Sequence, residues 1–543
     1  MTARGAAATT TAPAVTVGAL AWAAVAAAFV LLRLGPVFQA PVGGPELVHL
    51  SGAWQASAGF EDARFVPTLL QAIAALTFEW TESEVPARLV AFAATATVPV
   101  ALYLLRPVLG NAGALCALAV LAFDAPAIAL GSTASAMGLD VAIAAWLAVV
   151  VLRGGLPAPA WAAVAFILAA SGPLALPLVV SAAGVAFARR DPVRARTLAW
   201  MAAGAALAVA LATWRYGLGV DGLRVPPLDL LAAGYEERWS SATTARLAAV
   251  YGGPVLVAGL AAAAVSVVEA WRSRRASREQ MILLAWAGLA LGWLATSLTA
   301  HSPLPLAAAT MPLALLLGPA IVRAASAVAR AEWRVAIAGL PLAFLAFTIV
   351  YFVLARWARS GSRGGDFEST LLVLMLVMGV VALAIVAAER RSTPTLFIAA
   401  GVPFALLLVA TASGVAFSGS REPIPSPVST ENARMLRDIA MAARSGQGGL
   451  IVVHARYRDE ATWPLRGARG VVAASRIPPD ATVLIWPAGT SIPDGYSVVE
   501  GDWSLLLEFH PPGDILDYVR WLGDRTRVDA RPERIAVYMR NAP

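Results

Sequence analysis

Hydropathy divides this chain into two unequal parts. Residues 1–417 form a series of long apolar segments, whereas residues 418–543 have the mixed composition of a water-soluble domain. The 543 residues are 59% hydrophobic and only 14% charged, and the mean hydropathy is +0.70. One aqueous core cannot bury so much apolar surface, so most of the chain must have the lipid bilayer as its solvent. The sequence predicts a polytopic α-helical membrane domain, residues 1–417, followed by a soluble α/β domain, residues 418–543.

A transmembrane helix needs about 20 apolar residues, and this measure gives about thirteen candidate spans. The short fifth and sixth candidates are separated by Gly172-Pro173, so one kinked helix is the alternative there. The candidates cover residues 14–34, 87–105, 111–128, 134–152, 159–171, 173–188, 197–215, 246–270, 280–299, 303–322, 334–355, 369–389 and 395–417.

The distribution of arginine predicts the orientation. Lysine is absent, so all 41 basic residues are arginine. They cluster in the short loops 189–196, 272–278 and 390–391, and positively charged loops stay on the cytoplasmic side. If the N-terminus is cytoplasmic as well, residues 159–188 must cross twice. The C-terminal domain is then extracytoplasmic, and the chain lies in the cell membrane.

Two loops on the predicted outer side are long, residues 35–86 and 216–245. Within the first, residues 66–78 are apolar but too short to cross, which favours a helix in or near the membrane interface. Long loops on one side of a helical bundle are where sites are built. We therefore expect the functional site at this end of the bundle.

The C-terminal domain alternates between helical and strand-like hydrophobic patterns. It has neither a Gly-rich phosphate loop nor a Ser-His-Asp arrangement, so we expect it to recognise an acceptor or partner, or to cover the outer site, rather than to catalyse. The predicted helices cover residues 430–443 and 514–523. The predicted strands cover 449–454 and 482–486, one or two strands within 496–507, and a final strand at 534–539.

Four segments follow an order found in a known family. Residues 44–110 contain GPELVHLSGAW, then FVPTLLQAIAALTF, then SEVPARL leading into the second span. Residues 123–152 place an acidic residue at the start of the fourth span, residues 300–321 have a short polar entry before a late span, and residues 461–471 read ATWPLRGARGV. This order resembles the C-type (GT-C) membrane glycosyltransferases, especially the protein mannosyltransferase and aminoarabinose transferase-like group and its flippase-activity-associated subgroup.

The resemblance implies an enzyme that moves a sugar from a polyprenyl-phosphate carrier to an extracytoplasmic acceptor. The partners are then membrane lipid, the lipid-linked sugar, and a glycan, lipid or protein acceptor, with no nucleic acid. Such a transfer needs a carboxylate near the bilayer surface to accept the acceptor's proton. It also needs cations to hold the departing phosphate.

Glu46 and Asp140 are the predicted catalytic carboxylates. The family's first outer loop usually opens with Asp-Glu, whereas this chain has Pro45-Glu46. Either Glu46 or a nearby carboxylate such as Glu61 or Asp62 has taken the aspartate's role, or the chain no longer catalyses transfer. Asp140 matches the family's carboxylate at the start of the fourth span, where a charge is costly unless it is paired or faces a wet cavity. A structural pair with an arginine is the alternative for Asp140.

Cationic residues on the outer side are the candidates for substrate binding, because arginine and imidazolium groups suit phosphate oxygens. Interfacial anchoring is the alternative for the arginines. Glu46 and His49 would share one helix face. A Glu-x-x-His pair can bind a metal, but two ligands do not make a site, so a divalent metal is possible but unsupported, and we predict no certain cofactor and no metal ligands. The predicted substrate-binding residues are His49, Arg215, Arg224, His301 and Arg356.

Two other functions stay open. Pro45 favours a non-catalytic partner with a GT-C fold, acting in the assembly or export of envelope glycans. The second alternative is a transporter of lipid-linked sugar. The unequal outer loops, the soluble C-terminal domain and the lack of visible inverted repeats stand against a transporter.

Overall fold

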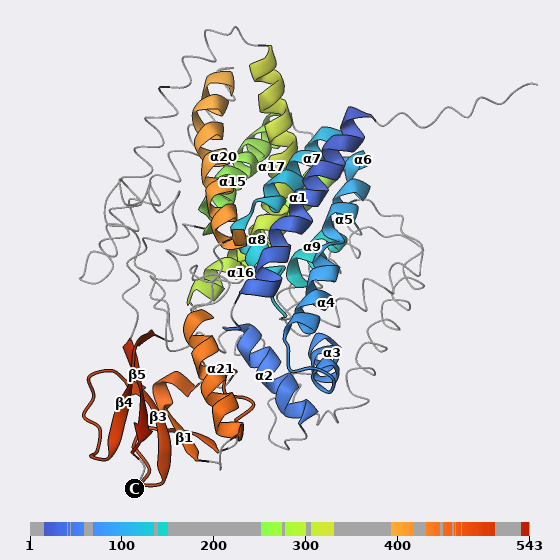
Figure 1. Cartoon of the computed structure of the whole chain (residues 1–543). Helices are drawn as coiled ribbons and strands as arrows, with labels where there is room; N and C mark the ends of the chain where they lie inside the picture. The colour runs from blue at the N-terminus through green and yellow to red at the C-terminus, as the bar shows by residue number, and fades with distance from the viewer. Residues whose placement is uncertain are drawn as a thin grey trace, which may run out of the picture.

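The protein, seen in a computed structural model, consists of a bundle of long helices and a smaller part built on a β-sheet (Figure 1). The sheet lies at the end of the bundle that also carries helices α2 and α3. The described residues are 16–40, 42–43, 45–58, 69–134, 139–149, 152, 251–273, 277–299, 306–330, 341, 393–417, 430–445, 449–458, 461, 463–468, 470–504 and 534–541.

The bundle contains both long helices and short helices that follow one another. Its helices are α1 (Val17–Gln39), α4 (Val85–Thr95), α5 (Val98–Leu104), α6 (Arg106–Leu109), α7 (Asn111–Ala122), α8 (Ala125–Leu130), α9 (Asp140–Ala148), α15 (Gly253–Ser273), α16 (Arg278–Thr299), α17 (Leu306–Ala329) and α20 (Thr393–Phe417).

Within the described residues, five helical stretches are long and apolar enough to cross a membrane. This confirms a multi-pass membrane protein. The number of thirteen crossings stays a prediction, because the candidate spans between residues 159 and 215, and those at 334–355 and 369–389, lie outside the described residues except for residue 341. The five stretches are Val17–Gln39, Val85–Leu104, Gly253–Ser273, Thr310–Ala329 and Ala400–Phe417.

Helices α1 and α20 run in the same direction. Their C-terminal ends meet, since Gly35 of α1 packs against the carbonyl oxygen of Ala416 in α20. Their N-terminal ends lie at the end of the bundle far from the sheet (Figure 1). If α1 and α20 are the first and last spans, as the sequence predicts, their parallel direction requires an odd number of crossings. Which face is cytoplasmic stays a prediction.

Two predicted spans are broken into pairs of helices. Residues 87–105 form α4 and α5, and residues 111–128 lie in α7 and α8. The second helix of each pair starts with a proline in its first turn, Pro99 in α5 and Pro126 in α8. A proline lacks an amide hydrogen, and its ring excludes the carbonyl four residues earlier, so an uninterrupted helix is disfavoured at both positions.

Helices α2 (Pro45–Ser57) and α3 (Leu69–Phe78) form the described part of the long loop after α1. Helix α3 matches the apolar segment predicted at residues 66–78. Both helices pack on one buried group of side chains, which we call the outer-loop core. Its members are Val42, Leu47, Leu50, Ala53, Ala74, Ala75, Phe78, Ala87, Ala134 and Trp463.

The C-terminal part packs one helix on a five-stranded sheet of order β2-β1-β3-β5-β4. Strand β1 is parallel to β2 and β3, whereas β5 is antiparallel to β3 and β4. The elements are α21 (Thr430–Ser445), β1 (Leu450–His454), β2 (Val471–Ala474), β3 (Ala481–Pro487), β4 (Tyr496–Ser504) and β5 (Arg534–Arg540).

The predicted α/β pattern of this part is confirmed for one helix and four strands. Strand β2 was not predicted, because it has only four residues and none of them is buried. The predicted helix at 514–523 lies outside the described residues.

Candidate functional site

An ion pair between Glu46 and Arg88 is buried at the end of the bundle that carries α2. Glu46 lies in the first turn of α2, and Arg88 lies in the first turn of α4. Arg88 Nε donates to Glu46 Oε1 and Arg88 Nη2 donates to Glu46 Oε2, each at 2.8 Å. Only 2% of Glu46 and 1% of Arg88 are exposed. This bidentate geometry is a strong form of arginine–carboxylate contact.

Backbone groups complete the surroundings of this pair. Arg88 Nη1 donates to the carbonyl oxygens of Val37, at 3.2 Å, and Ala40, at 2.7 Å, at the end of α1. These carbonyls belong to the last turn of a helix, where intrahelical partners are missing. The amide of Ala134 donates to Glu46 Oε1 at 2.7 Å. The pair therefore joins α1, α2, α4 and the segment that follows α8.

His49 lies one turn after Glu46 in α2 and is also buried. Its carbonyl oxygen accepts a hydrogen bond of 3.1 Å from Gln71 Nε2, which joins α2 to α3. Its side-chain Nε2 meets no hydrogen-bond partner in the part of the chain that the structure describes. Burial lowers the pKa of His49 to about 3, so the ring is neutral near pH 7. A neutral imidazole brings no positive charge to a phosphate.

A second pair of buried charged residues, Arg33 and Asp124, lies deeper in the bundle. Both side chains are fully buried. Arg33 donates to the carbonyl oxygens of Phe29, at 2.8 Å, and Leu121, at 2.9 Å. Asp124 precedes α8 and lies near Arg33 and Thr310, but neither of its oxygens reaches full hydrogen-bond geometry with a described residue. Ionisable side chains buried in a membrane domain are costly, so Arg33 and Asp124 are candidates for a functional or positioning role.

The segment after α8 passes closely over Arg33. A Cβ atom on Gly131 would lie 2.8 Å from Thr95 Cγ2 and 3.2 Å from Arg33 Nε, so only glycine fits there without displacing a neighbour. Three residues later, Ala134 donates to Glu46. The segment of residues 131–134 therefore passes close to Arg33 at its start and is bonded to Glu46 at its end, and in the sequence it precedes α9.

Asp140 is the first residue of α9, whereas the sequence predicted a span that begins at 134. The span prediction was wrong at this end, because residues 131–134 form turns and bends in which Ser132 and Thr133 bond carbonyls of α8. The start of a helix favours a carboxylate. Only the backbone position of Asp140 is described.

The other predicted substrate-binding residues, Arg215, Arg224, His301 and Arg356, lie outside the described residues, as do Glu61 and Asp62. Of the predicted site residues, the structure places Glu46 and His49 on one helix, and the start of α9 follows the segment that bonds Glu46. Among the described residues, no three His, Cys, Asp or Glu side chains are close enough to hold a metal ion.

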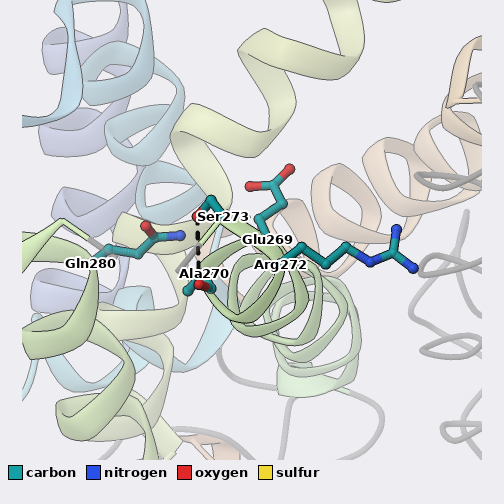
Figure 2. A pocket seen from close by; sticks show the side chains of 5 residues that line it. All are labelled: Glu269, Ala270, Arg272, Ser273 and Gln280. Atoms are coloured by element: carbon teal, nitrogen blue, oxygen red, sulfur yellow. Dashed lines mark hydrogen bonds between the residues drawn. The ribbon is translucent and has the colours of Figure 1, made fainter. Parts of the chain in front are cut away.

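A cavity of about 540 Å³ lies at the opposite end of the bundle. Figure 2 shows its lining, with Glu269, Arg272 and Ser273 near the end of α15 and Gln280 at the start of α16. Glu269 pairs with Arg323 of α17 at 2.6 Å, and both side chains are about half exposed. An exposed pair of this kind is a surface salt bridge, and it contributes little.

No protein-family model matches this chain, and no curated protein matches it either. Solved structures do match. ArnT from Cupriavidus metallidurans, in the apo state, aligns with a TM-score of 0.50 and 14% identity over 96% of this chain and 97% of that chain.

This chain has the fold of ArnT. The structure of ArnT bound to undecaprenyl phosphate aligns with the same values. The match confirms the fold that the resemblance to the C-type glycosyltransferases implies. At 14% identity the likeness concerns the fold alone.

Arg33 and Arg88 belong to the two buried charged groups but were not predicted as site residues, although the sequence contained an indication for each. Arg33 is a charged residue within a predicted span, and such residues are rare enough to mark function or pairing. Arg88 belongs to the SEVPARL run, but nothing local in the sequence indicates that its partner is Glu46, 42 residues earlier.

Proposed function

We propose that this chain is a C-type membrane glycosyltransferase that moves a sugar from a polyprenyl-phosphate carrier to an extracytoplasmic acceptor. The observation that carries the proposal is the fold match over 96% of the chain to ArnT, a protein solved with undecaprenyl phosphate bound. The buried charges of Glu46, Arg88, Arg33 and Asp124 add support, because such charges are kept in membrane domains where function needs them.

The contacts of Glu46 favour a positioning role over the role of general base. A general base must be within reach of the acceptor's proton, and only 2% of Glu46 is exposed. Both oxygens of Glu46 accept hydrogen bonds from Arg88, and Oε1 also accepts one from Ala134. We propose that Glu46 holds the segment that leads to α9, and that Asp140 at the start of α9 is the base.

The departing carrier phosphate needs positive charge. We propose that Arg215, Arg224, His301 and Arg356 supply it, since the predicted topology has all four on the outer side. His49 is less suited, because burial keeps its ring neutral. In this proposal His49 supports α2 instead of binding the carrier.

The test is transfer in a purified system. The full-length chain in nanodiscs is first titrated with undecaprenyl phosphate. It is then supplied with a panel of undecaprenyl-phosphate sugars together with a panel of glycan, lipid and protein acceptors, and the readout is the release of undecaprenyl phosphate as the sugar passes to an acceptor. We expect binding and release, and we expect Asp140→Asn to reduce turnover by about 10² or more while carrier binding is retained. Absence of binding would overturn the proposal.

A non-catalytic partner with the same fold is the second candidate. Pro45 in place of the family's aspartate favours it, as does the involvement of Glu46 in an ion pair. The same experiment separates the two functions. Tight binding of undecaprenyl phosphate without turnover of any sugar in the panel would favour the partner over the enzyme.

A further inference from the structure

We propose that the C-terminal part supplies two positioning residues to the site, Trp463 and Arg466, which hold α2, α3 and the start of α4 in place. This inference rests on the proposed function for its effect on turnover. Its structural half, the support of α2 and α3, can be measured without any activity.

Side chains of residues 461 and 463–465 are divided between two buried cores. Ala461 and Leu465 are buried in the core of the C-terminal part, with Leu436 of α21 and Ile451 of β1. Trp463 lies between them in sequence, is 5% exposed, and belongs to the outer-loop core instead. The segment therefore connects the sheet to the loop helices through alternate side chains.

Trp463 completes an aromatic group in the outer-loop core. Its ring centroid lies 5.5 Å from that of Phe78 at the end of α3. Phe78 in turn meets Trp54 of α2 edge to face, with a centroid distance of 5.7 Å. Contacts of this kind contribute beyond the area that they bury. Without Trp463, α2 and α3 would face a cavity the size of an indole ring.

The outer-loop core lies directly beside the ion pair of the site. Leu47 follows Glu46 in α2, and Ala87 precedes Arg88 in α4. Ala134, another member of this core, donates the amide hydrogen bond to Glu46. A shift of this core therefore moves the groups on both sides of the ion pair.

Arg466 provides a polar contact next to Trp463. Its guanidinium lies 3.9 Å from the centroid of the Trp463 ring, and Nη1 donates to the Trp463 carbonyl at 2.8 Å. Nη2 donates to the carbonyl oxygen of Glu82, just before α4 begins at Val85. Arg466 thus links the C-terminal part to the residues that lead into the helix of Arg88.

The test uses hydrogen exchange and kinetics on the purified full-length chain. The variants are Trp463→Ala, Trp463→Phe and Arg466→Gln. Trp271→Ala is the matched control, because that tryptophan is 81% exposed at the opposite end of the bundle. We expect faster exchange of α2 and α3 amides in Trp463→Ala and Arg466→Gln, with exchange of β1 and β3 unchanged. Trp463→Phe and Trp271→Ala should match the parent.

Kinetics test the positioning role. A displacement of about 1 Å in a site can cost roughly 10² in rate, so kcat should fall by about this factor in Trp463→Ala, while binding of undecaprenyl phosphate stays at the parent value and Trp463→Phe restores kcat. Unchanged exchange of α2 and α3 in both Trp463→Ala and Arg466→Gln would overturn the inference. Faster exchange with parental kcat would overturn the positioning role.

If the chain is not a glycosyltransferase, the result differs from failure of the positioning role. In that case the parent itself shows no turnover, and exchange still decides whether Trp463 and Arg466 hold the loop helices. If Trp463→Ala does not fold, Arg466→Gln and Trp463→Leu provide the same comparison with a smaller change in volume.

Discussion

Arg88 donates two parallel hydrogen bonds to Glu46, and both residues are almost completely buried. The residues are 42 positions apart in the sequence and belong to different helices. A buried pair is not itself a strong source of stability, because both charges lose their hydration. The pair instead fixes the relative orientation of the two side chains, because the planar guanidinium binds the carboxylate through two parallel hydrogen bonds.

Loss of one partner should be far more costly than loss of an exposed ion pair. We predict that Glu46→Gln lowers the free energy of unfolding by about 3–5 kcal/mol, because Arg88 is left as a buried, uncompensated charge. The control is Arg323→Gln, whose pair with Glu269 is about half exposed. That change should cost at most about 1 kcal/mol. The measurement is denaturant unfolding in mixed micelles, and equal losses in the two variants would contradict a structural role for the buried pair.

A side chain at Gly131 should destabilise the protein. A methyl group there would meet Thr95 and Arg33, so we predict that Gly131→Ala destabilises the protein by about 1–3 kcal/mol, the usual cost of overpacking. Gly288→Ala in α16 is the control, because a Cβ atom there has no neighbour within 4 Å among the described residues. Unfolding in the same micelles compares the two variants, and equal stability would mean that residues 131–134 can move away from Arg33 freely.

Stability should depend on pH through His49. Its pKa is about 3 in the folded chain and about 6.5 in the unfolded chain, so below pH 6.5 the unfolded state binds a proton that the folded state does not. Stability therefore falls as the pH decreases from 6.5 toward 3, and the loss at pH 5 is about 2 kcal/mol from this residue. We predict that His49→Leu loses less stability than the parent between pH 7.5 and pH 5. The same loss in both proteins would show that His49 becomes protonated without unfolding.

Periodicity predicted the elements that depend on local pattern. The length of the apolar segments predicted α1, α15, α17 and α20, and the hydrophobic pattern of short segments predicted β1 and β3. Burial on one or both faces of an element determines which of its own residues are apolar, so such elements can be recognised from the local sequence. The breaks before Pro99 and Pro126 fell within apolar runs, so hydropathy alone did not detect them. Proline position was the signal that could have done so.

The site was less predictable because its contacts join distant segments. Glu46 was selected as a carboxylate near the membrane surface, but nothing in the sequence revealed that Arg88 and the Ala134 amide occupy its oxygens. Trp463 could not be assigned to the outer-loop core either, since its neighbours in sequence pack in a different core. The local sequence pattern indicates which residues are buried, whereas tertiary packing determines which residues they contact.

The orientation in the membrane can be tested with one cysteine. We predict that Ser445→Cys, in a Cys116→Ser background, is labelled in intact cells by a thiol reagent that does not cross the membrane. Ser445 ends α21, which follows α20, and the C-terminal end of α20 meets that of α1. If the N-terminus is cytoplasmic, this end is extracytoplasmic. Labelling only after the cells are opened would contradict the predicted orientation and place Ser445 in the cytoplasm. The N-terminus would then be extracytoplasmic, because α1 and α20 run in the same direction.

The last prediction concerns the carrier phosphate. An anionic head group at the outer surface needs positive charge, and the proposed donors are Arg215, Arg224, His301 and Arg356. Removing a charge that makes a charge-assisted hydrogen bond to the phosphate should weaken binding of undecaprenyl phosphate by about 1.5–3 kcal/mol, whereas removing an interfacial anchor should change it little. Each residue is changed to glutamine, and affinity is measured for all four variants in one detergent. Arg272→Gln is the control, because Arg272 lines the cavity at the opposite end of the bundle. If the four variants and the control all bind as tightly as the parent, the carrier phosphate is held elsewhere, and the non-catalytic partner becomes the better hypothesis.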